Sequence, residues 1–589
     1  MVLRFGLIIV AALSVGCAHV ANSEVANSEV AAVKERVEPI TGVEQKTPEV
    51  KPLSGPESTL VEQSNLDAAL LYSLLGGELA GQRGEVGLAS VFYLSAAKHS
   101  KDPQVALRAA QIALYNKDIA AAKSAVDILV ADKNMSVPSH KLALTIYLRA
   151  GELEKSLQQI ELILKKSDIP VRNMLLAIGD VVSRNAVNGV AVSVMNTLVN
   201  KYPEEASVYL ARSQIVSRLG ELKQAERDAL KSTQLDPSWP TGFVQLALVL
   251  ENSGDTDGAL AVLKDASHRL KTRQLMMGYG QLLAKNEQYE AAKEKFLELV
   301  SLEQNYPEAR FALGLVYLKL DDAIRATEVF TRLYEAKAFP SKSAFYLGRI
   351  YYYQKEYEGA LAWFEKVAAS DHYIDAQASI AMIKSETGDL QGARSVLQRL
   401  RNAYPKKSVR FYLLEAELLM DGQHMKRSYD MLTEAINEIP DDLALRYARS
   451  IAATEIGELD LAEKDLLFVL EREPKDVNAL NALGYTLASK TFRFKEARYY
   501  LAQALALKPN DAAILDSMGW LNYREGRYEQ ALILLEKAYK TTPEGEIAAH
   551  LGETMWMLGR QKEARTVWED ALKRDAGNRY LIEVLQRLK

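Results

Sequence analysis

The sequence predicts an all-α fold, a superhelical solenoid of about 15 helix-turn-helix units. Two series of small residues predict it, because both recur every 33 to 35 residues and stay in phase along most of the 589 residues. Two helices that cross closely admit only Gly, Ala or Ser at the crossing, so each pair of small residues marks one unit. Leu144 is the one exception in the first series. The first series is Gly77, Ala110, Gly179, Ser213, Ala247, Gly280, Gly314, Gly348, Ala381, Ala416, Ser450, Gly484, Gly519 and Gly552. The second is Ala89, Ala122, Ser156, Ala191, Ala225, Ala259, Ala292, Ala326, Ala360, Ala393, Ser428, Ala462, Ala497, Ala531 and Ala564.

The remaining signals of each unit follow the same register. Apolar residues stand four and seven places after the second small residue, as Phe296 and Leu299 follow Ala292, which is the spacing of a buried helix face. Glycines favour the left-handed turn between the two helices, and prolines end the units. The turn glycines are Gly220, Gly254, Gly388, Gly457, Gly526 and Gly559. The prolines are Pro203, Pro237, Pro405, Pro440, Pro474, Pro509 and Pro543.

These signals place the repeat array at residues 66–577 and a capping helix at residues 578–589. Each unit leaves an apolar face that the next unit covers, so the stability of such an array is a sum over neighbours. Before about Ala206 the spacing persists, but the aromatic and proline signals are lost. We expect helical hairpins of slightly different pitch in that part of the array.

The start of the chain resembles a bacterial lipoprotein signal. Arg4 precedes an apolar run at residues 5–15 that is too short to span a bilayer. Gly16 and Cys17, the only cysteine, then match the lipoprotein box, in which the cysteine is acylated and becomes the mature N-terminus. We predict a signal peptide at residues 1–16 and lipidation at Cys17. An ordinary signal peptide that contains a cysteine is the alternative. In the proteins that this segment resembles, Ala18 in place of Asp implies the periplasmic face of the outer membrane.

Residues 17–65 have the composition of a tether. They are rich in Glu, Val, Ser and Pro, they contain no aromatic residue, and residues 21–25 are duplicated at 26–30. Such a segment buries too little apolar surface to offset the entropy of ordering it. We expect it to hold the repeat array away from the membrane.

Composition and motifs exclude several classes of function. The net charge of −5 offers no basic surface for nucleic acid. The seven histidines are scattered, no HExxH motif occurs, and no second cysteine is present to share a metal site. The glycine-rich residues 81–87 fall between two predicted helices with no strand before them, which disfavours a nucleotide loop. We therefore predict no catalytic residue, no metal and no cofactor, and we expect that the protein is not an enzyme.

In tetratricopeptide repeats, which these units resemble, the first helices line a concave groove at about positions 2, 5, 9, 12 and 13 of each unit. Aromatic and arginine side chains in such a groove are typical anchors for protein partners, and asparagines suit an extended peptide backbone. The alternative is that several rings pack between neighbouring first helices. The candidate groove residues are Phe345, Arg349, Tyr352, Tyr353, Asn478, Asn481, Tyr485, Asp516, Trp520, Tyr523, Arg524, Glu553 and Trp556.

Two terminal segments carry a more specific resemblance. Residues 78–84, 93–97 and 101–113, and residues 548–553 and 563–568 with Trp556, together with the lipoprotein box, resemble outer-membrane tetratricopeptide lipoproteins that act as adaptors for a periplasmic carboxyl-terminal processing protease. The resemblance implies recruitment of that serine protease and of its substrates, typically cell-wall hydrolases. Docking two proteins on one scaffold would raise their effective concentration.

Two other classes of function stay open on the sequence alone. One is an assembly factor for an outer-membrane secretin, pilus or exporter, which would change the multimeric state of a membrane pore. The other is a lipoprotein that activates a peptidoglycan synthase. A protease adaptor would instead be recovered together with a serine protease.

Overall fold

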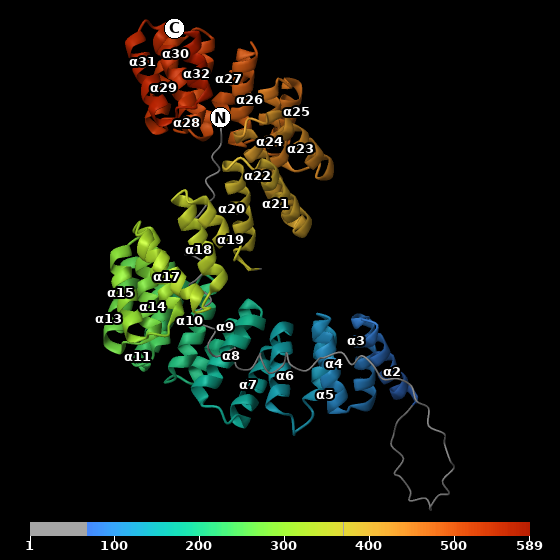
Figure 1. The fold of residues 1–589 in the computed structure, drawn as a ribbon. Helices are drawn as coiled ribbons and strands as arrows, with labels where there is room; N and C mark the ends of the chain where they lie inside the picture. The colour runs from blue at the N-terminus through green and yellow to red at the C-terminus, as the bar shows by residue number, and fades with distance from the viewer. Residues whose placement is uncertain (1–67, 369, 589) are drawn as a thin grey trace, which may run out of the picture. The chain divides into compact units, whose positions relative to one another are not determined.

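The fold is entirely helical in the residues described by the structure, a computed structural model that covers residues 68–368 and 370–588. Helices α2 to α32 follow one another without a strand in these two ranges, which confirms the predicted all-α solenoid (Figure 1). None of the helices in this described part is both long and apolar enough to cross a membrane. The predicted signal peptide, Cys17 and the tether lie outside the described residues.

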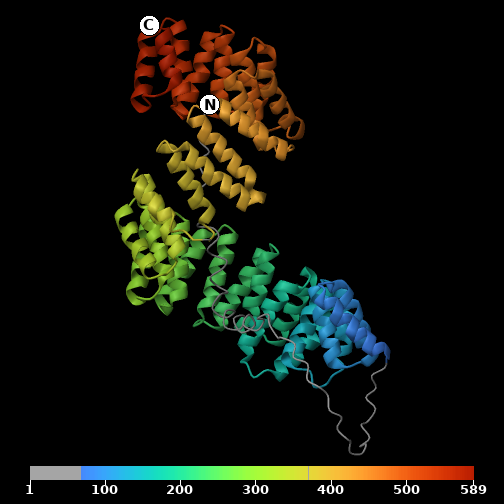
Figure 2. The same cartoon turned by 45° about the vertical axis from the view of Figure 1, so that its right-hand side comes forward.

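The chain divides into two compact units, with the boundary between Asp322 and Ala323. In each unit the helices lie side by side in chain order, as a second view also shows (Figure 2). The N-terminal unit contains α2 (Ala68–Gln82), α3 (Val86–Ser100), α4 (Pro103–Tyr115), α5 (Ile119–Leu129), α6 (Val137–Ala150), α7 (Leu153–Lys166), α8 (Val171–Asn185), α9 (Asn188–Lys201), α10 (Ala206–Arg218), α11 (Leu222–Leu235), α12 (Pro240–Asn252), α13 (Thr256–Leu270), α14 (Arg273–Lys285), α15 (Tyr289–Leu302) and α16 (Pro307–Lys319).

The C-terminal unit continues the same alternation and ends on one unpaired helix. It contains α17 (Ala323–Glu335), α18 (Pro340–Tyr353), α19 (Tyr357–Phe364), α20 (Tyr373–Glu386), α21 (Leu390–Ala403), the short 3-10 helix η2 (Pro405–Lys407), α22 (Ser408–Asp421), α23 (Met425–Glu438), α24 (Leu443–Ile456), α25 (Leu459–Arg472), α26 (Val477–Lys490), α27 (Phe494–Leu507), α28 (Ala512–Arg524), α29 (Tyr528–Thr541), α30 (Gly545–Met557), α31 (Gln561–Arg574) and α32 (Arg579–Arg587).

Small residues stand where the two helices of a hairpin touch, as the sequence predicts. A β-carbon added at Gly280 of α14 would lie 2.6 Å from the ring of Phe296 on α15. One added at Gly519 of α28 would lie 2.7 Å from Leu535 on α29. Real β-carbons do not approach other atoms so closely, so the helices could not stay at this separation with a larger residue. The second residue of each contact stands four places after the second small residue, which confirms the predicted stripe.

The turn signals are also confirmed. The residue between the two helices of a hairpin adopts a left-handed conformation, for example Gly457 with φ of 86° after α24. Where the glycine is missing, Lys117 and Gln423 take the same conformation with φ of 61° and 62°. Glycine therefore lowers the cost of this turn without being required for it. Each of the seven prolines lies two residues after the end of a second helix, where the helix has already stopped.

Hairpin pairing departs from the regular pattern around α8 and α9. Gly179 of α8 faces Ala211 of α10, to which an added β-carbon would approach within 2.6 Å, and not a residue of its own partner α9. Helix α8 packs more extensively against α10 than against α9. The repeat spacing therefore persists around α8 and α9 while the packing partner changes.

Ion pairs buried inside hairpins supplement the apolar contacts. In α10 and α11, Arg212 donates two hydrogen bonds to Asp228, at 2.8 and 2.6 Å. In α24 and α25, Arg449 binds both oxygens of the fully buried Asp465, at 2.7 and 2.8 Å. The arginine stands at the seventh and the aspartate at the 23rd position of the unit in both cases. The two oxygens of a carboxylate match the fork of a guanidinium, so the pair also fixes how the two helices are aligned.

Candidate functional site

The thirteen candidate groove residues all lie on first helices of the C-terminal unit. They belong to α18, α26, α28 and α30, and the structure brings nine of them together in two clusters. The α18 cluster contains the four candidates on α18. The C-terminal cluster contains Tyr485, Asp516, Trp520, Tyr523 and Glu553. The helices are held in place by the hairpin contacts described above, so the side chains of each cluster stand on a rigid framework.

The α18 cluster consists of Phe345, Arg349, Tyr352 and Tyr353. The ring of Tyr353 is 65% exposed, and the guanidinium carbon of Arg349 lies 5.7 Å from its centre. The hydroxyl of Tyr352 donates a hydrogen bond of 2.6 Å to Glu386 on α20. Burial and the charge of Glu386 raise the pKa of Tyr352, which keeps its hydroxyl protonated as a donor. Arg349 and Tyr353 are therefore available to a partner, while Tyr352 is already bound to the next first helix.

Phe345 packs between neighbouring helices, as the alternative interpretation of the groove rings predicts. It is 8% exposed and stacks on His372, at the start of α20, with ring centres 4.6 Å apart. It also lies 5.9 Å from Phe364 of α19. This ring packs between α18 and its neighbours and forms the floor beneath Arg349. Burial lowers the pKa of His372, so the histidine stacks as a neutral ring.

The C-terminal cluster is centred on His550 of α30. Its Nδ1 lies 2.9 and 3.1 Å from the two carboxylate oxygens of Asp516 on α28. Its ring stacks on Trp520 with centres 4.0 Å apart, and Trp520 stacks on Tyr523 at 4.6 Å. Burial alone would lower the pKa of His550, but the charge and hydrogen bond of Asp516 outweigh burial and raise it. The rings of Tyr523, Trp520 and His550 therefore form a stack, and His550 at its end is paired with Asp516.

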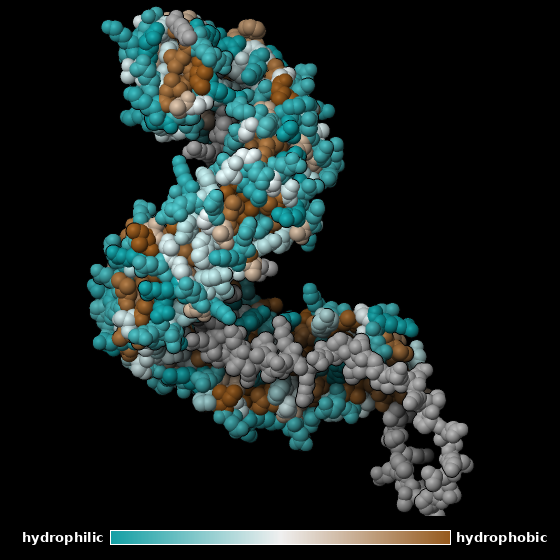
Figure 3. All heavy atoms as spheres, in the orientation of Figure 1, coloured by the Kyte–Doolittle hydropathy of each residue, from teal (hydrophilic) through white to brown (hydrophobic). Residues whose placement is uncertain are grey.

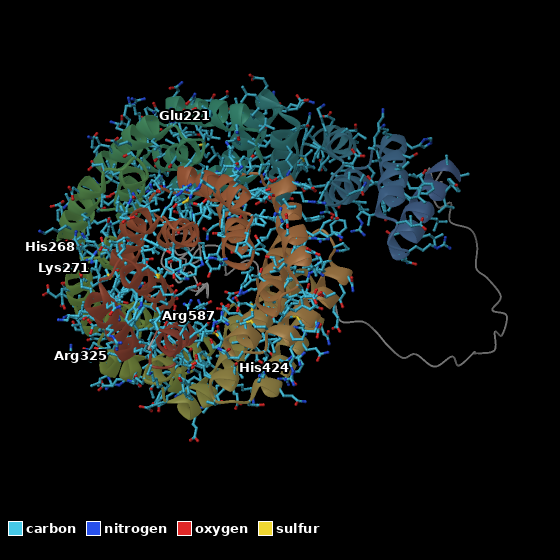
Figure 4. The ribbon with its side chains drawn as sticks, turned by 90° about the horizontal axis from the view of Figure 1, so that it is seen from above. Glu221, His268, Lys271, Arg325, His424 and Arg587 are labelled. Atoms are coloured by element: carbon cyan, nitrogen blue, oxygen red, sulfur yellow. The ribbon has the colours of Figure 1, made fainter. Side chains whose placement is uncertain are left out.

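Helix α32 and neighbouring helices complete this cluster. Tyr485 of α26 donates a hydrogen bond of 2.8 Å to Glu546 of α30. Glu553 accepts from Tyr523 at 3.1 Å and from Arg587 of α32. Figure 4 shows Arg587 on the inner side of the curved C-terminal unit.

A further bond ties α32 to a distant helix. Arg579 of α32 forms an ion pair of 2.8 Å with Glu455 of α24. On the other face of α32, Leu581 and Val584 are buried against Trp568, so the helix is also fastened by apolar contacts. Much of the hydrogen-bonding capacity of the C-terminal cluster is therefore used within the unit.

The four remaining candidates have separate surroundings. Asn478 is exposed beside a shallow depression bordered by Pro474 and Lys508, and Asn481 is buried. Arg524 donates a hydrogen bond of 2.5 Å to the carbonyl of Ser489. Trp556 stacks on Trp568 of its own hairpin, with centres 5.9 Å apart. Of these four, Asn478 is the one whose side chain lies at the open surface.

The structure adds residues that the sequence reasoning missed. Glu386 and Glu546 stand at groove positions 13 and 2 of their units, so reading the same register through every unit would have found them. Glu417 of α22 stands at position 9, and burial beside Asp421 raises its pKa to about 7. His372 and His550 stand outside the groove positions, and Arg579 and Arg587 come from a helix beyond the repeats. For the two histidines the sequence holds no repeat signal. Helix α32 begins 34 residues after α30, so continuing the register past the last hairpin would have placed Arg587 at position 9.

No group of three or more metal-binding side chains occurs among the described residues. The clusters contain stacked rings and paired charges, which suit contact with another polypeptide.

Comparison with known proteins identifies the family of the repeats. The tetratricopeptide repeat family matches residues 244–310, 279–341, 311–373, 375–407, 447–512 and 546–570. A tetratricopeptide repeat-containing protein of Pseudomonas aeruginosa is 31% identical over 496 residues, which cover 82% of each chain.

Solved structures resemble the chain more distantly. Naa15/Naa10 bound to HypK-THB aligns with 88% of this chain and 89% of its own, at 14% identity and a TM-score of 0.37. The Cut9–Hcn1 hetero-tetramer covers 83% and 97%, at 13% and 0.30. The pilF protein of Pseudomonas aeruginosa covers 34% and 92%, at 21% and 0.29. Repeats of this kind form protein-binding scaffolds, and none of the matching families is catalytic. The Pseudomonas relative, which aligns over 82% of the chain, and the repeated family matches show that the chain belongs to the tetratricopeptide repeat family.

Proposed function

We propose that the chain is an outer-membrane lipoprotein that recruits a periplasmic carboxyl-terminal processing protease together with its cell-wall hydrolase substrates. The α18 cluster carries this proposal, because Arg349 and the exposed ring of Tyr353 form an anchor of the kind that dominates protein interfaces. The resemblance of the terminal segments to known protease adaptors, stated above, supports the identity of the partner.

The proposal is tested by affinity purification of the intact lipoprotein from membranes. We expect a serine protease to be recovered with the wild-type chain, and recovery to fall at least about tenfold when Arg349→Ala and Tyr353→Ala are combined. Tyr499→Ala is the matched control, since this ring is 63% exposed but lies on the second helix α27. Recovery of a pore protein or a peptidoglycan synthase in place of the protease would contradict the proposal.

The membrane anchor is tested separately at Cys17. Two or three acyl chains hold a protein stably on a bilayer. We expect labelled palmitate to enter the wild-type chain and not the Cys17→Ala variant, which would then be found in the soluble periplasmic fraction. Equal labelling of both chains would show that Cys17 is not the anchor.

A further inference from the structure

The first helix of the array exposes an apolar stripe. Tyr72, Leu75 and Leu79 of α2 are 68%, 54% and 53% exposed, and Leu71 beside them is 44% exposed. Figure 3 shows hydrophobic side chains at the surface in the region of α2 and α3. Single exposed apolar residues are ordinary, but a continuous stripe along one helix marks an interaction site.

In interior units the residues at the same positions are buried between neighbouring units. Tyr72, Leu75 and Leu79 stand at positions 3, 6 and 10 of their unit. The residues at these positions in α28, namely Ile514, Ser517 and Leu521, are all at most 2% exposed. The same three positions of α10 are Val208, Ala211 and Ile215, which are at most 3% exposed. At these positions α10 packs against both helices of the unit before it, α8 and α9, and α28 likewise packs against α26 and α27. Helix α2 therefore presents the surface that the array elsewhere uses to join its units.

The sequence of residues 18–67 lacks the pattern of the helices that cover this surface in interior units. Residues 18–67 contain no aromatic residue, and Pro52 and Pro56 stand shortly before α2. Between Pro56 and α2 the large apolar residues are Leu60, Val61 and Leu66. The place 34 residues before Ala89 is Gly55, and the places four and seven after it are Thr59 and Glu62, so the stripe of a buried second helix is missing.

We propose that α2 binds α2 of a second copy of this chain, as the contact of a two-fold homodimer. In an antiparallel pair with Leu75 on the two-fold axis, Leu71 lies opposite Leu79 of the second copy. Leucines spaced by four residues form a ridge that fits between the ridges of a facing helix. The stripe thus complements itself, as an interface around a two-fold axis requires.

Charge supports the same arrangement. Glu78 is the only charged residue within α2. Within its own chain Glu78 accepts a hydrogen bond from Tyr93 of α3. The antiparallel register places Glu78 opposite the uncharged Tyr72 of the second copy, so like charges do not meet. A parallel pair would instead bring the two Glu78 side chains and the two positive helix N-termini together.

Cysteine crosslinking of the full chain tests the register. Leu75→Cys should form a disulfide across the two-fold axis under mild oxidation, because the two β-carbons meet there. Leu71→Cys and Leu79→Cys should crosslink more strongly when mixed than either variant alone. All variants keep Cys17, so the wild-type chain reports its background. Ile533→Cys, at a residue 68% exposed on α29, is the control for random collision.

The mass of the crosslinked product decides between occupants. A product of twice the chain mass supports the homodimer, and a product that contains a different protein overturns it. Light scattering provides the second measurement. The wild-type chain should be dimeric and Leu75→Glu monomeric, with unchanged helix content by circular dichroism because Leu75 is half exposed. A monomeric wild-type chain at about 10 μM, with no more crosslinking at Leu75→Cys than at Ile533→Cys, would overturn the proposal.

Discussion

At the scale of single residues, two histidines of the C-terminal unit have opposite electrostatic surroundings. His550 faces Asp516 of α28, with Glu546 and Glu553 nearby on α30, and its pKa is raised. His372 is buried against Phe345, with Lys342 close by, and its pKa is lowered. Both lie among the candidate groove residues, so each changes the charge of its cluster at a different pH.

His550 should therefore stabilise the protein below neutral pH. Its pKa in the unfolded chain is about 6.5 and its pKa in the folded chain is higher, so its contribution is complete below pH 6.5. The contribution is lost as the pH rises through the folded pKa. Thermal melts at several pH values should show this loss in the wild-type chain and not in His550→Gln. His372→Gln should remove an opposite effect, a loss of stability as the pH falls below about 6.5. A wild-type melting temperature with the same pH profile as His550→Gln would disprove this assignment.

Asp465 should be among the most sensitive single residues of the C-terminal unit. It is fully buried and binds both Arg446 and Arg449. Asp465→Asn leaves two guanidinium groups without a counter-charge, which should cost about 3–5 kcal/mol of unfolding free energy. Asp441→Asn is the matched control, because Asp441 is 86% exposed in its pair with Arg472 and such pairs contribute about 0–1 kcal/mol. Urea unfolding followed by circular dichroism measures both, and equal effects would contradict the argument.

At the scale of the helix pair, the spacing between backbones decides which residues are tolerated. Helix α14 contains two glycines, Gly278 and Gly280, which are two places apart and lie on different faces. A β-carbon at Gly280 would collide with Phe296 of α15, whereas one at Gly278 would meet nothing within 4 Å.

The two glycines should respond to alanine in opposite directions. Gly280→Ala forces the ring of Phe296 or the helices to move, which should cost about 1–3 kcal/mol. Gly278→Ala should stabilise the protein by about 0.5–1 kcal/mol, since alanine loses less backbone entropy in a helix. Chemical unfolding of the two variants checks the sign. A stable Gly280→Ala variant would mean that α14 and α15 separate easily.

The helix pair is also the scale at which sequence reasoning succeeded. The contact between Gly280 and Phe296 depends on repeat spacing, and spacing is visible in the sequence. The direction of a groove side chain depends on its neighbours, which the spacing does not show. Phe345 and Trp556 stand at groove positions and yet pack on His372 and Trp568. Gly179 shows the same limit, because its position was predictable but its packing partner on α10 was not.

At the scale of the whole molecule, residues outside the repeats were the least predictable part of the candidate site. Arg587 belongs to α32, a single helix that follows the last hairpin and begins 34 residues after the start of α30. Its bond to Glu553 joins the end of the chain to a groove position. The repeat spacing locates the helices correctly. The spacing does not show which groove side chains are already bound to other residues of the same chain.

The ion pair between Arg579 and Glu455 has a consequence for how the C-terminus opens. A linear array normally frays from its end, one hairpin after another, because each member touches only its neighbours. Here the last helix, α32, forms an ion pair with α24, so detachment of α32 also removes a contact of an interior helix. Arg579→Ala should therefore speed amide hydrogen exchange in α24 as well as in α32, by an amount worth about 1 kcal/mol or less. Faster exchange confined to α32 would show that the terminus peels away on its own.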